Sequence, residues 1–390
     1  MKKTISLAVT LFILLMTFIP LTAFASGTVA TNLSGGSELS LDAAGACLME
    51  ATTGKILYSN NELIAASPAS VTKIMTLLLV AEALEKEYYS LADKVTVSAN
   101  AASMGGSQVF LEEGESMCVE ELIKCTVIAS ANDAAVALAE LTAGSEEAFV
   151  KMMNYRANEL GLKNTSFENT TGLDDTTTNH YSCPLDIAIM SRELIKHDII
   201  LKYSSVWQDT IRDGEFTLTN TNRLVRYYDG CNGLKTGSTD KAGYCVSATA
   251  KRGNMQLIAV IMGSETRDQR NAAARTLLDY GFANYALAEF PKEFIENVPV
   301  LCGKQDFVPV SSSGFSAVVK KQELSEIEYR YDIPESLSAP VSDGEVVGQI
   351  VYSLNGNEIG VCDIIAQNGV EKIGFFDVLW RILKRIACGE

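Results

Sequence analysis

Histidine is nearly absent from this chain, in which only His180 and His197 occur among 390 residues. A Ser-His-Asp triad would need one of these two side chains, and neither lies in a nucleophile-elbow or trypsin-like pattern. A catalytic zinc ion generally takes three protein ligands, and the sequence has neither an H-E-x-x-H motif nor a cluster of histidine and cysteine. We therefore expect no metal and no other cofactor, and a catalytic base that is not histidine.

Runs of lysine and arginine are also missing from the body of the sequence. The chain has 48 acidic and 32 basic residues and a formal net charge of −16. Nucleic-acid recognition needs a basic patch, so this balance argues against that class of partner. From net charge alone we expect a neutral or cationic ligand.

One long apolar run, from Ile5 to Ile19, lies near the start of the chain. It follows Lys2 and Lys3 and precedes Ala23-Phe24-Ala25, the small-x-small pattern that a signal peptidase reads. The run is short for a membrane-spanning helix. Residues 1–25 are therefore predicted to be a signal peptide, and the protein is expected to be exported.

A regular cysteine framework is lacking as well. The nine cysteines are odd in number, are scattered and include no C-x-x-C pair. Most of them are expected to be small buried apolar residues, although an exported protein could also form disulfides.

Strand patterns at 46–50, 55–58, 233–237, 243–251 and 255–262 flank a central region rich in helix patterns. The predicted helices are 69–86, 119–129, 133–142, 146–160 and 184–197, with another at 270–280 after the strands. The first of these helices is apolar on nearly every face, which indicates burial. This order predicts an α+β fold, in which helices pack on a mixed antiparallel sheet and form a helical lobe.

A second module follows, in which apolar residues alternate from Ile327 to Ile333. Residues 295–367 are therefore predicted to form a small β-rich domain. Residues 370–390 are expected to form an amphipathic basic helix, with apolar residues at helical spacing around Trp380. A membrane surface is favoured as its partner, and packing on the protein itself is the alternative.

Ser70-Val71-Thr72-Lys73 offers a nucleophile and a base, because residues three apart on a helix face the same way. A buried lysine with a lowered pKa can accept the serine proton. Such a pair is weak support alone, since chance matches are common. It is followed, however, by Ser130-Ala131-Asn132 in the break between two helices and by Lys235-Thr236-Gly237 on a strand.

These three motifs, in this order, resemble those of the penicillin-binding protein and serine β-lactamase superfamily. The sequences around Ser70, Ser130, His180 and Lys235 are similar to those of low-molecular-mass penicillin-binding proteins that act as D-alanyl-D-alanine carboxypeptidases. The resemblance covers roughly residues 38–365, and the amphipathic tail is similar to the membrane anchor of that family. It implies a β-lactamase/transpeptidase-like catalytic domain over residues 38–290.

The resemblance also implies a role for each matching residue. Ser70 would be acylated, Lys73 would be its base, and Ser130 and Asn132 would line the cleft and relay protons. The substrate would be bound by Lys235, Thr236, Gly237, Ser238 and Arg270, with the backbone N–H groups of Ser70 and Ser238 as the oxyanion hole. His180 is expected to be structural and to lie near the cleft.

The expected function is removal of the terminal D-alanine from peptidoglycan stem pentapeptides at the outer face of the cytoplasmic membrane. β-Lactam antibiotics would be covalent inhibitors. Three alternatives stay open at this point: a D,D-endopeptidase of peptide cross-links, a β-lactamase and a non-catalytic wall-binding protein. The β-lactamase is disfavoured, because the sequence after Glu168 does not match the Glu-x-x-Leu-Asn pattern of the deacylating glutamate.

Overall fold

The computed structural model describes residues 39–388, so the predicted signal peptide at residues 1–25 lies outside the described residues. The first domain is built on a five-stranded sheet with the order β2-β1-β9-β8-β7, in which every neighbouring pair is antiparallel. Its strands are β1 (Gly45–Glu50), β2 (Ile56–Asn60), β7 (Cys231–Thr239), β8 (Gly243–Arg252) and β9 (Met255–Ser264).

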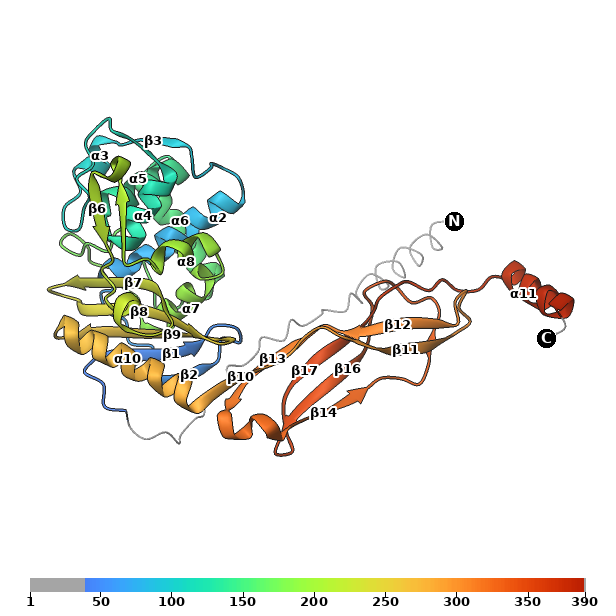
Figure 1. Ribbon diagram of the computed structural model, residues 1–390. Coiled ribbons are helices and arrows are strands. Elements are labelled where there is room, and N and C mark those ends of the chain that lie inside the picture. The colour runs from blue at the N-terminus through green and yellow to red at the C-terminus, as the bar shows by residue number, and fades with distance from the viewer. Residues whose placement is uncertain (1–38, 389–390) are drawn as a thin grey trace, which may run out of the picture. The chain divides into compact units, whose positions relative to one another are not determined.

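Side chains alternate between the two faces of the sheet along each strand, so each strand presents side chains to both faces. Helices cover both of these faces. Leu48 and Leu257 point toward α10 (Arg267–Asn284), where a Cβ atom at Gly281 would lie 2.5 Å from Leu257 Cδ1. On the other face Gly45 meets Pro184 at the start of α7 (Pro184–Leu194). Figure 1 shows the two helices on opposite sides of the sheet.

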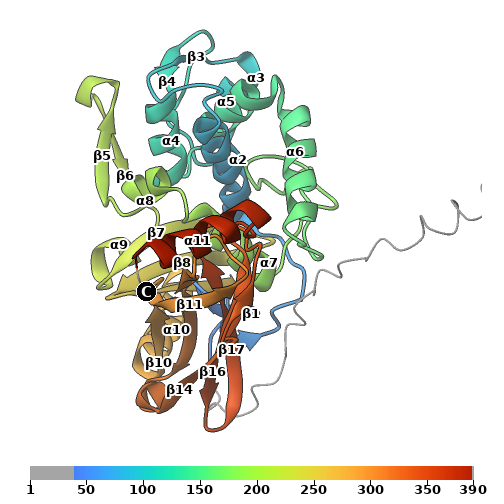
Figure 2. The same ribbon diagram turned by 90° about the vertical axis from the view of Figure 1, so that its right-hand side faces the viewer.

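The helical lobe surrounds α2, which is buried along nearly its whole length as its sequence predicted. Figure 2 shows α2, α4, α5 and α6 gathered in this lobe. The helices that follow β2 and precede β7 in the sequence are η1 (Ala69–Thr72), α2 (Lys73–Glu85), α3 (Ala99–Ala102), α4 (Val119–Ile128), α5 (Asn132–Ala143), α6 (Glu146–Glu159), α7, α8 (Asp198–Ser204), η2 (Arg212–Gly214) and α9 (Leu224–Tyr227).

Two pairs of short antiparallel strands in the same region were not predicted. They are β3 (Lys94–Thr96) with β4 (Ser116–Cys118), and β5 (Gln208–Ile211) with β6 (Phe216–Thr219). These strands have only three or four residues each, and half or more of their side chains are partly or fully exposed. Short polar strands of this kind carry little alternation for a sequence pattern to detect.

The second domain contains a six-stranded sheet with the order β14-β16-β17-β12-β11-β15 and a separate pair, β10 with β13. Its apolar core includes Val298, Val308, Ile350 and Ile364. The elements are β10 (Tyr285–Phe290), β11 (Phe294–Leu301), β12 (Phe307–Ser312), β13 (Phe315–Lys320), η3 (Lys321–Glu326), β14 (Ile327–Asp332), β15 (Leu337–Ser338), β16 (Val346–Leu354) and β17 (Asn357–Ala366). The predicted α+β class followed by a β-rich domain is confirmed.

The strand that showed the clearest alternation, β14, lies at an edge and pairs only with β16. Tyr329 and Tyr331 on it are therefore about half exposed, although they lie on the apolar side of the pattern. The pattern thus located the strand correctly but did not reveal its place in the sheet.

The last helix, α11 (Phe375–Cys388), begins five residues after the predicted start at residue 370. Its apolar side chains are exposed, with Phe376 at 81% and Trp380 at 70%. Among residues 39–388, no helix combines the length and the apolar character needed to cross a membrane.

Eight of the nine cysteines have described side chains; all eight are free thiols, and five of them are buried. Burial raises the pKa of the thiols of Cys183, Cys231 and Cys245 to about 11, which keeps them protonated. They behave as the small apolar side chains that the sequence predicted.

Candidate active site

Ser70 lies in the short helix η1, directly before α2 begins at Lys73. The preceding residue, Ala69, has a φ of +47°, a conformation that costs free energy for any residue other than glycine. Lys73 Nζ lies 3.0 Å from Ser70 Oγ, so the predicted pair does share one face of the helix.

The amine of Lys73 is fully buried and contacts two carbonyl oxygens besides the serine. Its Nζ atom is 2.5 Å from Asn132 Oδ1 and 2.9 Å from the backbone oxygen of Thr171. Burial, together with the nearby charge of Lys235, holds the pKa of Lys73 well below its usual range. A neutral amine has two N–H bonds and one lone pair. In this form the two carbonyl oxygens would take the N–H bonds, and the lone pair would be left to accept the proton of Ser70.

Ser130 and Lys235 form a second contact between a hydroxyl and a buried amine. Lys235 Nζ donates to Ser130 Oγ at 2.7 Å and to the backbone oxygen of Thr236 at 3.0 Å. Burial, followed by the charge of Arg270, lowers the pKa of Lys235 to about 7. Ser130 has a φ of +64°, which turns its hydroxyl group out of the break between α4 and α5. The site therefore joins two lysine–serine pairs of similar design.

Gly237 is required by the close approach of β7 to η1. A Cβ atom at residue 237 would lie 2.8 Å from the backbone nitrogen of Ser70 and 2.9 Å from that of Val71. The neighbouring Thr236 is fixed by a hydrogen bond of 2.8 Å from its hydroxyl to Thr221 Oγ1. The absence of a side chain at residue 237 thus lets the strand run directly beside the nucleophile.

Arg270 is buried near the start of α10, and its guanidinium contacts only neutral oxygens. It donates to Asn271 Oδ1 at 2.9 Å and 3.1 Å, and to the backbone oxygen of Cys245 at 3.5 Å. Burial, followed by the charge of Arg267, lowers the pKa of Arg270 to about 10, so the group is still a cation at neutral pH. A buried cation without a carboxylate partner is suited to binding an anionic ligand.

A cavity of about 600 Å³ brings most of the predicted residues together. Its lining includes Ser70, Ser130, Thr236, Gly237, Ser238 and Arg270. Lys73, Asn132 and Lys235 do not line the cavity. Lys73 and Lys235 contact the hydroxyl groups of Ser70 and Ser130, which do line it, and Asn132 is joined to Ser70 through Lys73. The lining contains three arginines and no carboxylate, so the expectation of a neutral or cationic ligand does not hold for this cleft. Net charge averages over a whole surface and does not set the potential of one cavity.

The loop 169–172 also supports Lys73, and sequence reasoning missed this role. Gly172 has a φ of +84°, and a Cβ atom there would lie 1.8 Å from the backbone oxygen of Ala69. The side chain of Asn169 accepts the N–H of Gly172 at 2.7 Å, which holds the turn that presents the Thr171 oxygen to Lys73. An Asn-x-x-Gly turn was the only local signal for this loop.

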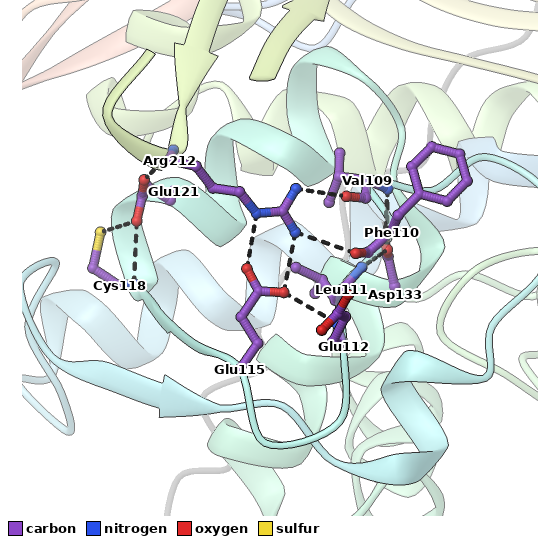
Figure 3. A network of polar contacts seen from close by, with 9 residues as sticks. All are labelled: Val109, Phe110, Leu111, Glu112, Glu115, Cys118, Glu121, Asp133 and Arg212. Atoms are coloured by element: carbon purple, nitrogen blue, oxygen red, sulfur yellow. Dashed lines mark hydrogen bonds and ion pairs between the residues drawn. The ribbon is translucent and has the colours of Figure 1, made fainter. Parts of the chain in front are cut away.

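A second unpredicted segment, residues 105–115, borders the site and is held by a polar network (Figure 3). Arg212 donates to Glu115 at 2.8 Å and to the backbone oxygens of Val109 and Phe110 at 3.0 Å and 3.2 Å. The Asp133 carboxylate accepts the N–H of Val109 at 3.0 Å. Next to these anchors, the backbone oxygen of Gly105 accepts from the side chain of Asn132 at 2.7 Å. The network therefore reaches one of the groups that position Lys73.

His180 is buried behind the nucleophile and holds backbone and side-chain groups in place. Its Nδ1 accepts the N–H of Glu168 at 3.0 Å, so its Nε2 is the atom that donates to Thr72 Oγ1 at 2.7 Å. Burial lowers the pKa of His180 to about 4, which keeps the ring neutral. The Glu168 carboxylate accepts the N–H groups of Thr178 and Asn179 and does not line the cavity.

Comparison with known proteins agrees with this geometry. Residues 32–266 match the D-alanyl-D-alanine carboxypeptidase family, and residues 290–372 match the C-terminal domain of penicillin-binding protein 5. The chain is 43% identical over 390 residues to D-alanyl-D-alanine carboxypeptidase DacF of Bacillus subtilis, with 98% of each protein covered.

Two solved structures are similar to this fold. Penicillin-binding protein 5 from Haemophilus influenzae matches with a TM-score of 0.77 and 32% identity, covering 87% of this chain and 100% of its own. Penicillin-binding protein D2 from Listeria monocytogenes, in its ampicillin-bound form, matches with a TM-score of 0.59 and 31% identity, covering 63% of this chain and 100% of its own. The expected activity class, a serine-type peptidase, is confirmed, and the chain belongs to the D-alanyl-D-alanine carboxypeptidase family.

Proposed function

We propose that this protein removes the terminal D-alanine from peptidoglycan stem pentapeptides through an acyl-enzyme on Ser70. The observation that carries the proposal is the contact of 3.0 Å between Ser70 Oγ and the buried amine of Lys73, whose pKa lies well below its usual range. A serine hydroxyl is a weak nucleophile unless a base takes its proton, and this amine is such a base.

Acylation and hydrolysis follow from the two lysine–serine pairs. Ser70 Oγ attacks the carbonyl carbon of the penultimate D-alanine while Lys73 Nζ takes the hydroxyl proton. The C–N bond then breaks, and Ser130, held by Lys235, passes its hydroxyl proton to the nitrogen of the departing D-alanine and receives in return the proton that Lys73 had taken. Water next cleaves the ester, releases the shortened peptide and restores the serine. Asn132 keeps Lys73 oriented throughout.

The negative oxygen of the tetrahedral intermediate would be stabilised by the backbone N–H groups of Ser70 and Ser238. The closeness of Gly237 to the nitrogen of Ser70 supports this pairing, since it brings β7 against the nucleophile. Loss of one such donor typically costs about 3 to 4 kcal/mol of transition-state stabilisation.

The carboxylate of the terminal D-alanine would be bound by Lys235, Thr236 and Arg270. Arg270 has no carboxylate partner among the described residues, and Thr236 presents its hydroxyl group in the same cavity. A guanidinium and a carboxylate form strong, charge-assisted hydrogen bonds. A free carboxylate at the end of the substrate is therefore the group that this cleft selects.

Labelling with fluorescent penicillin tests the nucleophile. The wild-type protein should form a covalent adduct, and Ser70→Ala should form none. Ser107→Ala is the matched control, because this serine also lines the cavity but is not the proposed nucleophile, and it should label like the wild type. Equal labelling of Ser70→Ala would refute the assignment. A stable adduct would also separate this protein from a β-lactamase, which would release the hydrolysed drug.

Incubation with a pentapeptide stem and with a cross-linked peptide dimer tests the leaving group. We expect free D-alanine from the first substrate, identified by mass, and no cleavage of the second. Cleavage of the dimer at a comparable rate would favour the endopeptidase alternative.

The protein is proposed to act at the outer face of the cytoplasmic membrane, with a signal peptide at 1–25, a catalytic domain at 38–290 and a β-rich domain at 295–367. The tail at 370–390 would bind the membrane surface through α11, whose exposed apolar residues include Phe376 and Trp380. Basic residues on the same helix would contact anionic head groups.

Co-sedimentation with anionic phospholipid vesicles tests this membrane contact. The full chain should sediment with the vesicles, and Trp380→Glu should stay in solution. Phe294→Glu is the control, because Phe294 is similarly exposed but lies on β11 of the β-rich domain. Equal sedimentation of Trp380→Glu would contradict the proposal.

A further inference from the structure

The cleft contains more positive charge than one substrate carboxylate needs. Arg223, just before α9, and Arg267, the first residue of α10, line the same cavity as Ser70 and Arg270. None of these three guanidinium groups lies within ion-pair distance of a carboxylate among residues 39–388. Three free cations therefore meet in one cavity.

This arrangement differs from that of many other arginines in the chain. Arg156, Arg212 and Arg381 each pair with a carboxylate at 2.8 Å to 3.1 Å. Acidic residues outnumber basic ones by 48 to 32 in the full chain, and yet none of the aspartates and glutamates among residues 39–388 lines the cavity. Acidic partners are thus abundant elsewhere and absent from this cleft.

The position of two of these arginines on α10 is electrostatically unfavourable in the free protein. The N-terminus of a helix carries a partial positive charge and favours acidic side chains. Arg267 and Arg270 lie in the first turn of α10, and the charges of Arg267 and Arg223 both contribute to the lowered pKa of Arg270. The three cations therefore repel one another, and a bound anion would relieve that repulsion.

The positions of the arginines in the cavity indicate which group of a substrate would supply the bound anion. Under the proposed function, on which this inference rests, Arg270 and Thr236 bind the carboxylate of the leaving residue. Arg223 and Arg267 line the same cavity as these groups, and its aromatic wall is formed by Trp207 and Tyr227, whose rings are 6.3 Å apart. A side chain on the leaving residue would thus extend among the remaining cations.

We infer that Arg223 and Arg267 form a second anionic subsite, which accepts a leaving D-amino acid that carries a side-chain carboxylate. D-Glutamate at the end of the peptide is the simplest such residue. Its α-carboxylate would bind as that of D-alanine does, and its side-chain carboxylate would reach the two exposed arginines. The subsite would therefore broaden the range of stem peptides that the enzyme trims.

Three synthetic peptides test this inference, each diacetyl-L-Lys-D-Ala followed by D-Ala, D-Glu or D-Gln. D-Glu and D-Gln have nearly the same shape and differ in charge, so the ratio of their kcat/KM values isolates the side-chain carboxylate. We expect wild-type protein to prefer D-Glu over D-Gln by about tenfold, as expected from two partly exposed charge pairs.

The double variant Arg223→Gln/Arg267→Gln should lower this ratio to about one and should still cleave the D-Ala peptide. Arg275→Gln is the matched control, because Arg275 is also exposed on α10 but does not line the cavity. It should keep the wild-type ratio.

A wild-type ratio near one would overturn the inference, and so would a preference for D-Glu that persists in the double variant. In either case, cleavage of the D-Ala peptide would leave the proposed function intact. Failure of the wild type to cleave any of the three peptides would instead refute the proposed function, and the inference with it.

Discussion

Gly172 lies against the carbonyl group of Ala69, so closely that a Cβ atom at residue 172 would be 1.8 Å from the Ala69 oxygen. This contact joins two segments that are about a hundred residues apart in the sequence. One carries Ser70, the proposed nucleophile, and the other carries the Thr171 oxygen that accepts a hydrogen bond from Lys73. The geometry of the nucleophile therefore depends on a loop that has no catalytic side chain of its own.

Gly172→Ala is expected to destabilise the protein by about 3 kcal/mol, because the new methyl group overlaps backbone atoms and the residue has a positive φ. Urea unfolding measures this loss. The rate of penicillin labelling at saturating drug should also fall, because the loop 169–172 must shift away from Lys73.

Gly161→Ala is the matched control for this prediction. Gly161 also has a positive φ, of +72°, but a Cβ atom there would meet open space. Its substitution should cost only about 1 kcal/mol from backbone strain and should leave labelling unchanged. Equal losses of stability in Gly172→Ala and Gly161→Ala would show that the contact with Ala69 is unimportant.

Lys73→Arg is expected to slow acylation by a factor of about 10² to 10⁴. Arginine keeps its proton at any pH that proteins tolerate, so it cannot act as the base. The rate of penicillin labelling measures the effect. Lys124→Arg, at an ion pair of 3.0 Å with Asp209 outside the cavity, should label at the wild-type rate. A fast Lys73→Arg variant would place the base elsewhere.

Acidification should destabilise the protein through His180. In the unfolded chain this side chain takes up a proton near pH 6.5, whereas in the folded protein its pKa is about 4. Between these values the unfolded state binds more protons, so stability is lost as the pH falls from 6.5 to 4. The loss amounts to about 3 kcal/mol over this range.

Urea unfolding of wild type and of His180→Gln at pH 7 and pH 4.5 measures this contribution. The difference in free energy of unfolding between wild type and His180→Gln should be smaller at pH 4.5 than at pH 7. Wild type loses the contribution of His180 on acidification, whereas glutamine does not titrate. Parallel pH curves for wild type and His180→Gln would contradict the prediction.

Arg212 and Glu115 are expected to be coupled by about 1 kcal/mol in a double-mutant cycle, because their ion pair is partly exposed. The free energies of unfolding of wild type, Arg212→Gln, Glu115→Gln and the double variant give this coupling energy. Arg212→Gln should also slow acylation by about tenfold, because segment 105–115 contacts Asn132. An unchanged acylation rate would mean that the network stabilises the fold without positioning the site.

The sequence was sufficient to propose Ser70, Lys73, Ser130 and Lys235 as one site, because each lies in a short motif whose spacing is preserved by a helix, a helix break or a strand. Thr171 and Arg212 could not be found in this way. Their contributions are a backbone oxygen and an ion pair across a distance of about a hundred residues, and neither leaves a local pattern. The strands and helices of the first domain were predicted for the same local reasons, whereas the hairpin β5–β6 was too short and polar.

The arginine-lined cavity in an acidic chain has a consequence for the rate at which ligands arrive. The net negative charge of the chain repels carboxylate-bearing peptides, whereas the exposed Arg223 and Arg267 attract them at the cavity. Such a field orients a diffusing anion before contact, so the end that carries the carboxylate enters first. The guidance extends over about one Debye length, which makes the association rate depend on the ionic strength of the surrounding medium.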